Sequence, residues 1–440
     1  MELDPVLLAR IQFAVTIMFH YIFPPLTIGL ATLMVIMEAC HLKTGNKLYH
    51  DMAHFWTKMF AISFVLGVAS GIVMEFQFGT NWSVYSRYVG DVFGSALAIE
   101  GIFAFFMESG FLAILVFGRN RVSSKMHLFS TFMVALGATF SATWIIIANS
   151  WQQTPAGFHL VEHGSSIRAE MVDFWAVVFN PSSMIRLGHT LVGAYINGAF
   201  FVLAVSAYYL LKNIHVEFAK KCISIALPFA LFFCLLSLYT GHIQAQSVGK
   251  YQPTKLAAFE GHFKTGAADM YAWGIPNEEE KKVDYGFRIP GGLSFLMHGN
   301  FSQEVDGLDK SPQDEWPPLG ITFQSYHIMI AFGMAMIGLT GLAFIFFLKG
   351  NLFQQKWLLF LFIPALILPF ICNQAGWIAA EVGRQPWIVY GLLKTKDAIS
   401  NVSPVLVLTS LIIFCIVYSV LFVLWLHFLG KQIKKGPESI

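Results

Sequence analysis

Long apolar runs separated by short polar segments are the dominant pattern along this chain. Each run reaches about 20 residues or more, the length that an α-helix needs to cross a hydrocarbon core about 30 Å thick. The pattern therefore predicts an all-α integral membrane protein, folded as a bundle of nine transmembrane helices. The predicted helices lie approximately over residues 11–39, 55–78, 96–118, 128–148, 187–211, 222–245, 323–348, 357–380 and 403–429.

The composition supports the same class. Of the 440 residues, 56% are hydrophobic and 12% are charged, whereas soluble domains carry roughly 25% charged residues. The five cysteines show no C-x-x-C or C-x-x-C-H spacing, so we expect neither a disulfide framework nor a covalently attached c-type haem. All of them lie in or at the edges of predicted helices, at Cys40, Cys222, Cys234, Cys372 and Cys415.

Lysine and arginine residues gather in alternate connections, and cytoplasmic connections are the ones that retain positive charge. The opposite side holds the acidic "MELDP" start and loops of mixed charge. We therefore expect the N-terminus outside the cell and the C-terminus in the cytoplasm. No basic segment or A-x-A cleavage site precedes the first run, so a removable signal peptide is not expected. The basic connections and tail contain Lys43, Lys47, Arg119, Arg121, Lys125, Lys212, Lys220, Lys221, Lys349, Lys356, Lys431, Lys434 and Lys435.

Residues 246–322 interrupt the pattern of spans with a long polar segment rich in Gly and Pro. This segment separates six predicted helices, within residues 1–245, from three helices and a basic tail, within residues 323–440. The charge distribution places it outside, and polar connections of this length are usually functional loops. Its "PPLG" and "IPGG" sequences would equally suit a flexible linker, whereas the aromatic and aliphatic residues of "YQPTKLAAFEGHF" could pack against the bundle.

Several ionisable residues fall within or at the ends of the predicted helices. A charged group at the bilayer centre costs about 2.5–3.5 kcal/mol on insertion scales, so each one predicts a partner, a cofactor or water. These residues are His20, Lys58, Glu75, Glu100, Glu108, His189, His242 and Glu381.

Two of these carboxylates share the third predicted helix. Glu100 and Glu108 are eight residues apart, which separates them by about 12 Å along a regular helix and by about 80° around it. Each alone could be a protonated carboxyl bonded to a neighbouring helix. Two on one helix, with Ser109 beside the second and Ser141 and Asn149 on the next helix, favour successive sites of a proton relay.

His20 and His189 are flanked by apolar and small residues, as in a haem-binding helix. A lone buried histidine is more often a hydrogen-bonded core residue, and Met329 in "SYHIMIAFG" is a weaker signal because methionine is ordinary core filling. The residues alone leave both interpretations open.

The segment "WIAAEVGRQPW" places polar residues at the end of the eighth predicted helix. Trp377, Glu381 and Arg384 stand at i, i+4 and i+7 on one helix face, and Pro386 ends the helix. Arg384 could pair with Glu381, or bind the carboxylate of a cofactor propionate, which would make Arg384 and Trp377 cofactor contacts. An interfacial aromatic belt with a salt bridge is the alternative.

Five long segments closely resemble subunit I of the cytochrome bd family of quinol oxidases. The similarity runs in order over essentially the whole chain, with nine helices and a long outer loop. The segments are "RIQFAVTIMFHYIFPPLTIG", "FWTKMFAISFVLGVASGIVMEFQFGTNW", "ALAIEGIFAFFMES", "QPTKLAAFEG" and "WIAAEVGRQPW".

The resemblance implies three haems: a low-spin haem b, a high-spin haem b, and a haem d or a third haem b. His189 and Met329 match the family's ligands of the low-spin haem. His20 and Glu381 match the ligands of the two high-spin haems, with Glu100 close by. Which of His20 and Glu381 serves the oxygen-reducing haem differs between family members and stays open.

The resemblance also implies a quinol site and a proton route. The outer loop looks like the shorter form of the family's quinol-binding loop, with Lys255 and Glu260 at its matching positions. Two positions depart from the family pattern: His327 stands where arginine is more usual, and Asn120 where some members have aspartate. The expected proton route from the cytoplasm comprises Lys58, Glu108, Ser141 and Glu100.

The expected function is that of a terminal respiratory oxidase in a bacterial or archaeal cell membrane. Such an enzyme oxidises quinol at the outer face and reduces O2 to water with cytoplasmic protons, so that it generates proton motive force without pumping. The expected partners are subunit II, with or without a small single-helix subunit, and the lipid bilayer, but no nucleic acid. A cofactor-free proton-coupled transporter or channel is the alternative, because it too would concentrate carboxylates in helices.

Overall fold

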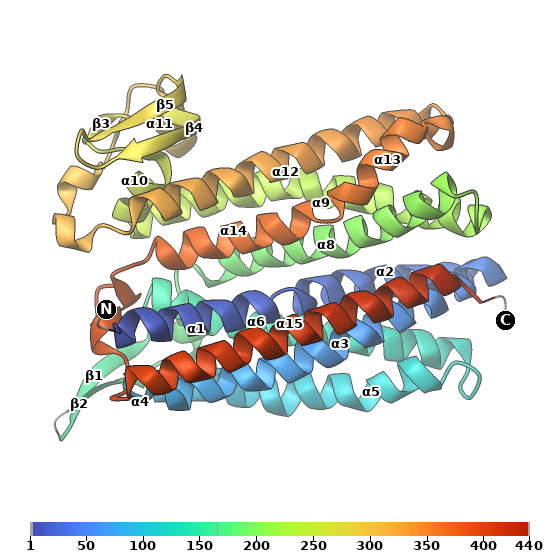
Figure 1. Ribbon diagram of the computed structural model, residues 1–440, viewed down its shortest axis with the longest axis horizontal. Helices are drawn as coiled ribbons and strands as arrows, with labels where there is room; N and C mark the ends of the chain where they lie inside the picture. Colours follow the sequence, from blue (N-terminus) through green and yellow to red (C-terminus); the bar gives the residue numbers. More distant parts are fainter. Residues whose placement is uncertain (1–2, 165, 439–440) are drawn as a thin grey trace.

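The protein is a long bundle of helices that lie roughly side by side, with small β-structures at one end (Figure 1). The coordinates are a computed structural model that describes residues 3–164 and 166–438. Within that part of the chain, nine helical stretches are long and apolar enough to cross a membrane, which confirms the predicted fold class. They are Pro5–Thr44, Lys47–Thr80, Ser83–Phe117, Ser124–Gln153, Ser183–Leu211, Val216–Tyr251, Leu319–Leu348, Lys356–Val382 and Pro404–Lys435.

The first span consists of two helices, α1 (Pro5–His20) and α2 (Phe23–Thr44). The break falls just before Pro24 and Pro25, which lack the backbone N–H groups that a continuous helix would need. His20 is therefore the last residue of α1. The prediction of one continuous helix was wrong in this detail.

The third span is also irregular. It comprises α4 (Ser83–Ile99), a π-helical turn η1 (Glu100–Phe105) and α5 (Phe106–Phe117). Single π-helical turns are frequent at functional sites, and here the turn begins at Glu100. Because the turn is wider than an α-helical one, the separation of about 80° expected for Glu100 and Glu108 on a regular helix does not hold.

The eighth span is likewise divided, into α13 (Lys356–Ala365) and α14 (Leu368–Val382). Pro364 and Pro369 flank the division. Pro369 lacks the backbone N–H that a continuous helix would donate to the oxygen of Ala365. The short helix α14 carries Glu381 close to its C-terminal end.

A close glycine contact joins two neighbouring spans. A Cβ atom on Gly29 of α2 would lie 2.5 Å from the backbone oxygen of Ala194 in α8 (Ser183–Leu211), and a Cβ on Gly198 would lie 2.4 Å from Gly29. Small residues let membrane helices pack this closely. The main hydrophobic core lies around this contact and includes Trp56 and Phe200.

The remaining long helices complete the bundle. Figure 1 shows α8, α9, α12 and α14 on one side, and α1, α2, α3, α5, α6 and α15 on the other. The N- and C-termini lie at opposite ends, as an odd number of spans requires. The bounds not yet given are α3 Lys47–Thr80, α6 Ser124–Gln153, α9 Val216–Tyr251, α12 Leu319–Leu348 and α15 Pro404–Lys435.

The long polar segment is folded. Helix α9 extends to Tyr251 and α12 begins at Leu319, so the boundaries predicted at 245 and 323 move into the loop by a few residues. Leu256, Phe259 and Leu293 of the loop pack against α12 and α14, which rules out the flexible-linker interpretation. The loop contains α10 Pro253–Glu260, β3 Gly266–Ala267, β4 Met270–Asn277, β5 Lys282–Ile289, α11 Gly292–His298, β6 Glu304–Val305, η2 Leu308–Lys310 and η3 Gln313–Glu315.

The short strands lie at the same end of the bundle as the loop (Figure 1), whereas η4 joins α12 to α13 at the opposite end. The strands pair antiparallel as β4 with β5, β3 with β6, β1 with β2, and β7 with β8. The remaining bounds are β1 Phe158–His163, β2 Ser166–Met171, α7 Phe174–Val178, η4 Leu352–Gln354, β7 Trp387–Val389, β8 Leu393–Lys394 and η5 Thr395–Asp397.

Candidate functional site

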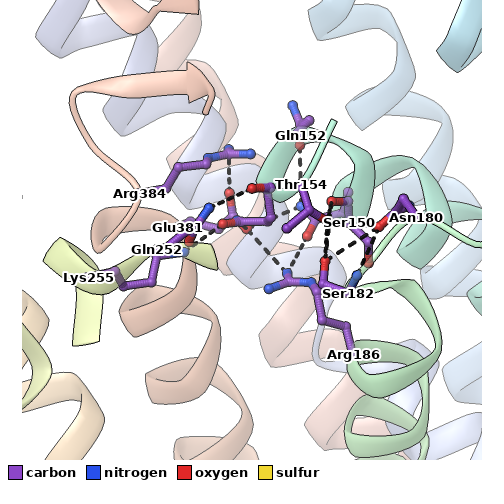
Figure 2. A network of polar contacts seen from close by, with 12 residues as sticks. Ser150, Gln152, Thr154, Asn180, Ser182, Arg186, Gln252, Lys255, Glu381 and Arg384 are labelled. Atoms are coloured by element: carbon purple, nitrogen blue, oxygen red, sulfur yellow. Dashed lines mark hydrogen bonds and ion pairs between the residues drawn. The ribbon is translucent and has the colours of Figure 1, made fainter. Parts of the chain in front are cut away.

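Glu381, whose side chain is 32% exposed, is the centre of a polar cluster at the loop end of the bundle (Figure 2). Its Oε1 accepts hydrogen bonds from Asn149 Nδ2 at 3.2 Å and from Gln153 Nε2 at 3.0 Å, both on α6. Its Oε2 accepts a hydrogen bond from Arg384 Nη2 at 2.5 Å. Arg186 Nη2, from the first turn of α8, lies 3.8 Å from Glu381 Oε1.

Lys255 reaches the same cluster from the loop. Its Nζ donates a hydrogen bond to Gln153 Oε1 at 2.6 Å. Burial, with the nearby charge of Arg186 second, lowers the pKa of Lys255 well below its usual value. Lys255, Arg186 and Arg384 are only 3%, 7% and 6% exposed, so three buried basic side chains lie around a single carboxylate.

Several N–H groups of this cluster lack partners. Within the described residues, Nε of Arg186 and both Nε and Nη1 of Arg384 are buried without a hydrogen-bond acceptor. Buried charged groups are stable only when paired and hydrogen-bonded, and guanidinium groups match carboxylates bidentately. The cluster therefore fits an anionic group that brings further carboxylates, such as the propionates of a haem.

The predicted pairing of Arg384 with Glu381 is present, but the shared helix face is not. Helix α14 ends at Val382, two residues before Arg384. The guanidinium carbon of Arg186 lies over the Trp377 ring, 5.7 Å from the ring centroid. The rings of Trp377 and Tyr21 meet edge to face, with their centroids 5.5 Å apart.

His20 and His189 are held in the same manner. His20 Nδ1 is hydrogen-bonded to Ser70 Oγ of α3 at 3.1 Å, and His189 Nδ1 to Thr240 Oγ1 of α9 at 2.9 Å. Histidines that bind a metal through one ring nitrogen usually have the other fixed by a hydrogen bond. One ring nitrogen of each histidine is thus held by a hydroxyl, and this donor set fits ligation of a haem iron.

Met329 of α12 faces α14. A Cβ atom on Gly376 of α14 would lie 2.9 Å from Met329 Sδ, and a Cβ on Gly241 would lie 3.5 Å from the His189 ring. Glycine at these positions leaves space beside both side chains. The hydrogen bonds among the described residues join neither His20 nor His189 to Glu381.

The two carboxylates of the third span both contact α6. Glu100 Oε1 accepts a hydrogen bond from Ser141 Oγ at 2.5 Å. Glu108 is 8% exposed, and a Cβ atom on Gly137 would lie 2.7 Å from its Cγ. The structure thus places Ser141 against Glu100, whereas Asn149, which the sequence offered to the relay, contacts Glu381.

Lys58 lies elsewhere, towards the C-terminal end of the bundle. Its Nζ donates a hydrogen bond to Glu438 Oε2 at 2.7 Å, and the side chains of the pair are 30% and 38% exposed. Lys58 therefore has a partner in the tail, and none of the hydrogen bonds or ion pairs among the described residues joins it to Glu100 or Glu108.

Glu260 and His327 lie beneath the strands of the loop. Glu260 is 1% exposed, and burial raises its pKa to about 7. The backbone N–H of Tyr271 in β4 lies 3.5 Å from Glu260 Oε2. His327 Nε2 hydrogen-bonds the backbone oxygen of the same Tyr271 at 2.8 Å, so His327 ties α12 to β4.

Arg186 and Gln153 are the main residues that sequence reasoning missed. Arg186 lies three residues before His189 in "SSMIRLGHT", so it carried the same signal as the other buried ionisable residues. It was overlooked because the fifth span was predicted to begin at residue 187, whereas α8 begins at Ser183. Gln153 is uncharged and gave no comparable signal.

Comparisons with known proteins agree over the whole chain. Residues 8–437 match the family described as "Cytochrome bd terminal oxidase subunit I". The chain is 40% identical to "Cytochrome bd ubiquinol oxidase subunit 1" of Bacillus subtilis (strain 168), over 99% of this chain and 95% of that protein. It is 33% identical to "Cytochrome bd-II ubiquinol oxidase subunit 1" of Escherichia coli (strain K12), over 99% of this chain and 98% of that protein.

A solved structure shows the same fold. The bd oxidase from Geobacillus thermodenitrificans superimposes with a TM-score of 0.91 at 30% sequence identity, over 99% of both chains. These matches set aside the transporter alternative. The chain belongs to the cytochrome bd terminal oxidase subunit I family, and is therefore a multi-pass cell-membrane subunit of a quinol:oxygen oxidoreductase.

Proposed function

We propose that this chain is the haem-carrying subunit of its oxidase, with quinol oxidised at the loop end of the bundle and protons taken up at the opposite end. The observation that carries this proposal is the buried cluster of Lys255, Arg186 and Arg384 around Glu381, whose unpaired N–H groups suit an acidic cofactor. In this orientation the loop end is the outer face and the C-terminus is cytoplasmic.

The histidine, methionine and glutamate side chains hold the haems in this proposal. His189 and Met329 would ligate a low-spin haem b, while His20 and Glu381 would serve a high-spin haem b and a haem d or third haem b, with Glu100 near them. Arg186 and Arg384 would bind propionates, and Trp377 would pack beside the same cofactor. When bound, the haems supply electron transfer and an iron with an open position for O2.

The loop residues supply the chemistry for quinol. Glu260, with its raised pKa, can accept a proton from a quinol hydroxyl at the outer face. Lys255 links that region to Glu381 through Gln153. An apolar groove of about 790 Å³ between α1, α12 and α14 lies beside this region and is lined in part by Ile22, Gln324 and Phe370. Its apolar lining suits the hydrocarbon tail of a quinol.

The α6 side of the bundle carries protons. Glu108 and Glu100, with Ser141, would deliver protons from the cytoplasmic half to the site of O2 reduction, since a chain of polar groups through hydrocarbon is the form expected of a relay. Electrons from the outer face and protons from the inner face then charge the membrane without a pump. A second subunit completes the oxidase, as the family implies.

An absorption spectrum and an oxygen assay on the purified complex test this proposal. We expect reduced-minus-oxidised difference bands of more than one haem per complex, together with quinol-dependent O2 consumption. A correctly assembled complex without haem absorption would contradict it, and the band positions would decide between haem d and a third haem b.

A further inference from the structure

The end of the bundle opposite Glu381 buries a second group of ionisable side chains. Glu38 of α2 is 7% exposed and His127 of α6 is 5% exposed. His127 Nδ1 lies 2.9 Å from Glu38 Oε1, and His127 Nε2 lies 3.2 Å from the backbone oxygen of Leu115. Nothing in the proposed function uses this pair.

Two further residues fix Glu38 in place. Thr131, one turn after His127 on α6, donates a hydrogen bond from its hydroxyl to Glu38 Oε2 at 3.0 Å. Arg119, in the turn between α5 and α6, lies 3.6 Å from Glu38 Oε1 and donates a hydrogen bond to the backbone oxygen of His50 at 2.8 Å. Buried ion pairs give little net stability, so stability alone is a weak reason for this arrangement.

A set of titratable residues leads from this pair to the surface. His50 Nδ1 lies 3.5 Å from Asp51 Oδ1, and the two side chains are 25% and 16% exposed. The ring centroids of His41 and His50 are 5.2 Å apart. His41, His50 and Asp51 are all partly exposed, so solution reaches them. The other charged groups beside this set are Arg119, His54, Lys58 and Glu438.

Towards the loop end of the bundle, residues of α6 contact the carboxylates of the proposed proton route. Thr131 contacts Glu38, Gly137 contacts Glu108, and Ser141 contacts Glu100. With a rise of about 1.5 Å per residue, these three contacts succeed one another over about 15 Å along one helix. Asn149 and Gln153 continue the series to Glu381.

We propose that Glu38 and His127 form a proton-loading pair for the route to Glu108, and that His41, His50 and Asp51 collect protons for it. A proton from solution passes through the collecting residues to the Glu38–His127 pair, and from there, with the Thr131 hydroxyl and water as carriers, to Glu108. Each step moves one proton and no electrons. The inference rests on the proposed direction of proton uptake and names its point of entry.

The test uses the complete oxidase complex carrying Glu38→Gln or His127→Gln. The matched control is Glu217→Gln, which alters an exposed ion pair with Lys220 in the first turn of α9. We expect a fall of about tenfold or more in O2 reduction and a larger solvent deuterium isotope effect for both test variants, since general acid–base groups contribute about 10²–10⁴-fold. Anaerobic haem reduction by quinol, the haem spectrum and the quinol KM stay unchanged, and Glu217→Gln behaves as wild type.

A Glu108→Gln variant distinguishes the loading pair from the proposed proton route. If Glu108→Gln is slow while Glu38→Gln and His127→Gln keep wild-type turnover and isotope effect, the loading pair is wrong and the proposed route stands. If Glu108→Gln is also unaffected, the proposed route fails, and the loading pair fails with it.

A surface variant covers the case in which the buried variants do not assemble. His50→Gln combined with Asp51→Asn alters only partly exposed side chains. We expect it to slow O2 reduction most at high pH, where protons in solution are scarce. Unchanged turnover over the whole pH range would overturn the proposal.

Discussion

Lys255 Nζ and Gln153 Oε1 form a 2.6 Å hydrogen bond that joins the loop helix α10 to the end of α6. Gln153 in turn donates to Glu381 at 3.0 Å. Gln153 therefore connects Lys255, which is expected to face quinol, to Glu381, which is a proposed haem ligand. The loop and the cofactor cluster form one connected site.

Replacing Lys255 with Met should weaken quinol use while leaving the fold intact. A hydrogen bond to a charged group contributes about 1.5–3 kcal/mol, which corresponds to a rise in the quinol KM of about 10- to 100-fold. Steady-state kinetics with Lys310→Met as the control, an exposed lysine in the same loop, would measure this. A normal quinol KM in Lys255→Met would show that Lys255 does not contribute to quinol binding.

Arg186→Leu should lower the haem content of the complex. The variant removes a buried guanidinium whose Nε has no partner among the described residues. Arg186→Lys keeps the charge without the bidentate fork and should give an intermediate content. Haem absorbance per complex is the measurement, and Arg288→Leu, on the exposed strand β5, is the control. Full haem content in Arg186→Leu would exclude it as an anchor.

Glu108→Gln should slow O2 reduction about 100-fold or more, because the amide cannot carry a proton. Haem reduction by quinol under anaerobic conditions should remain near the wild-type rate. Stopped-flow absorbance can follow both processes, with Glu162→Gln in an exposed strand as the control. Equal slowing of both processes would indicate a structural defect rather than a broken relay.

Quinol oxidation should depend on the protonation of Glu260. Burial raises the pKa of this carboxyl to about 7, so below that pH the group is already protonated and cannot accept a quinol proton. The rate of haem reduction by quinol should therefore rise as pH increases through about 7, and Glu260→Gln should be slow and lack this rise. A pH profile that is the same in wild type and Glu260→Gln would refute the assignment.

The nine spans were predictable because each one needs only a long apolar run, whatever its neighbours are. The breaks after His20 and Ala365 were not predicted, although Pro24 and Pro364 mark them, because prolines within membrane helices are often tolerated. The π-helical turn at Glu100 has no comparable sequence signal.

The candidate site was predictable in its chemistry more than in its contacts. Glu381 and Arg384 are close in sequence, so their pairing could be expected from local spacing. The contact of Lys255 with Gln153 depends on how the loop folds over α6, and the contacts of His20 with Ser70 and of His189 with Thr240 depend on how neighbouring helices are rotated. The periodicity of the sequence determines neither the fold of the loop nor the rotation of neighbouring helices.

The low-spin haem spectrum of His189→Ala tests the central claim most directly. The proposal predicts that the assembled complex loses this signal and its quinol-dependent O2 consumption, while Thr190→Ala on the same helix retains both. A His189→Ala complex with the full wild-type spectrum and normal turnover would contradict the account.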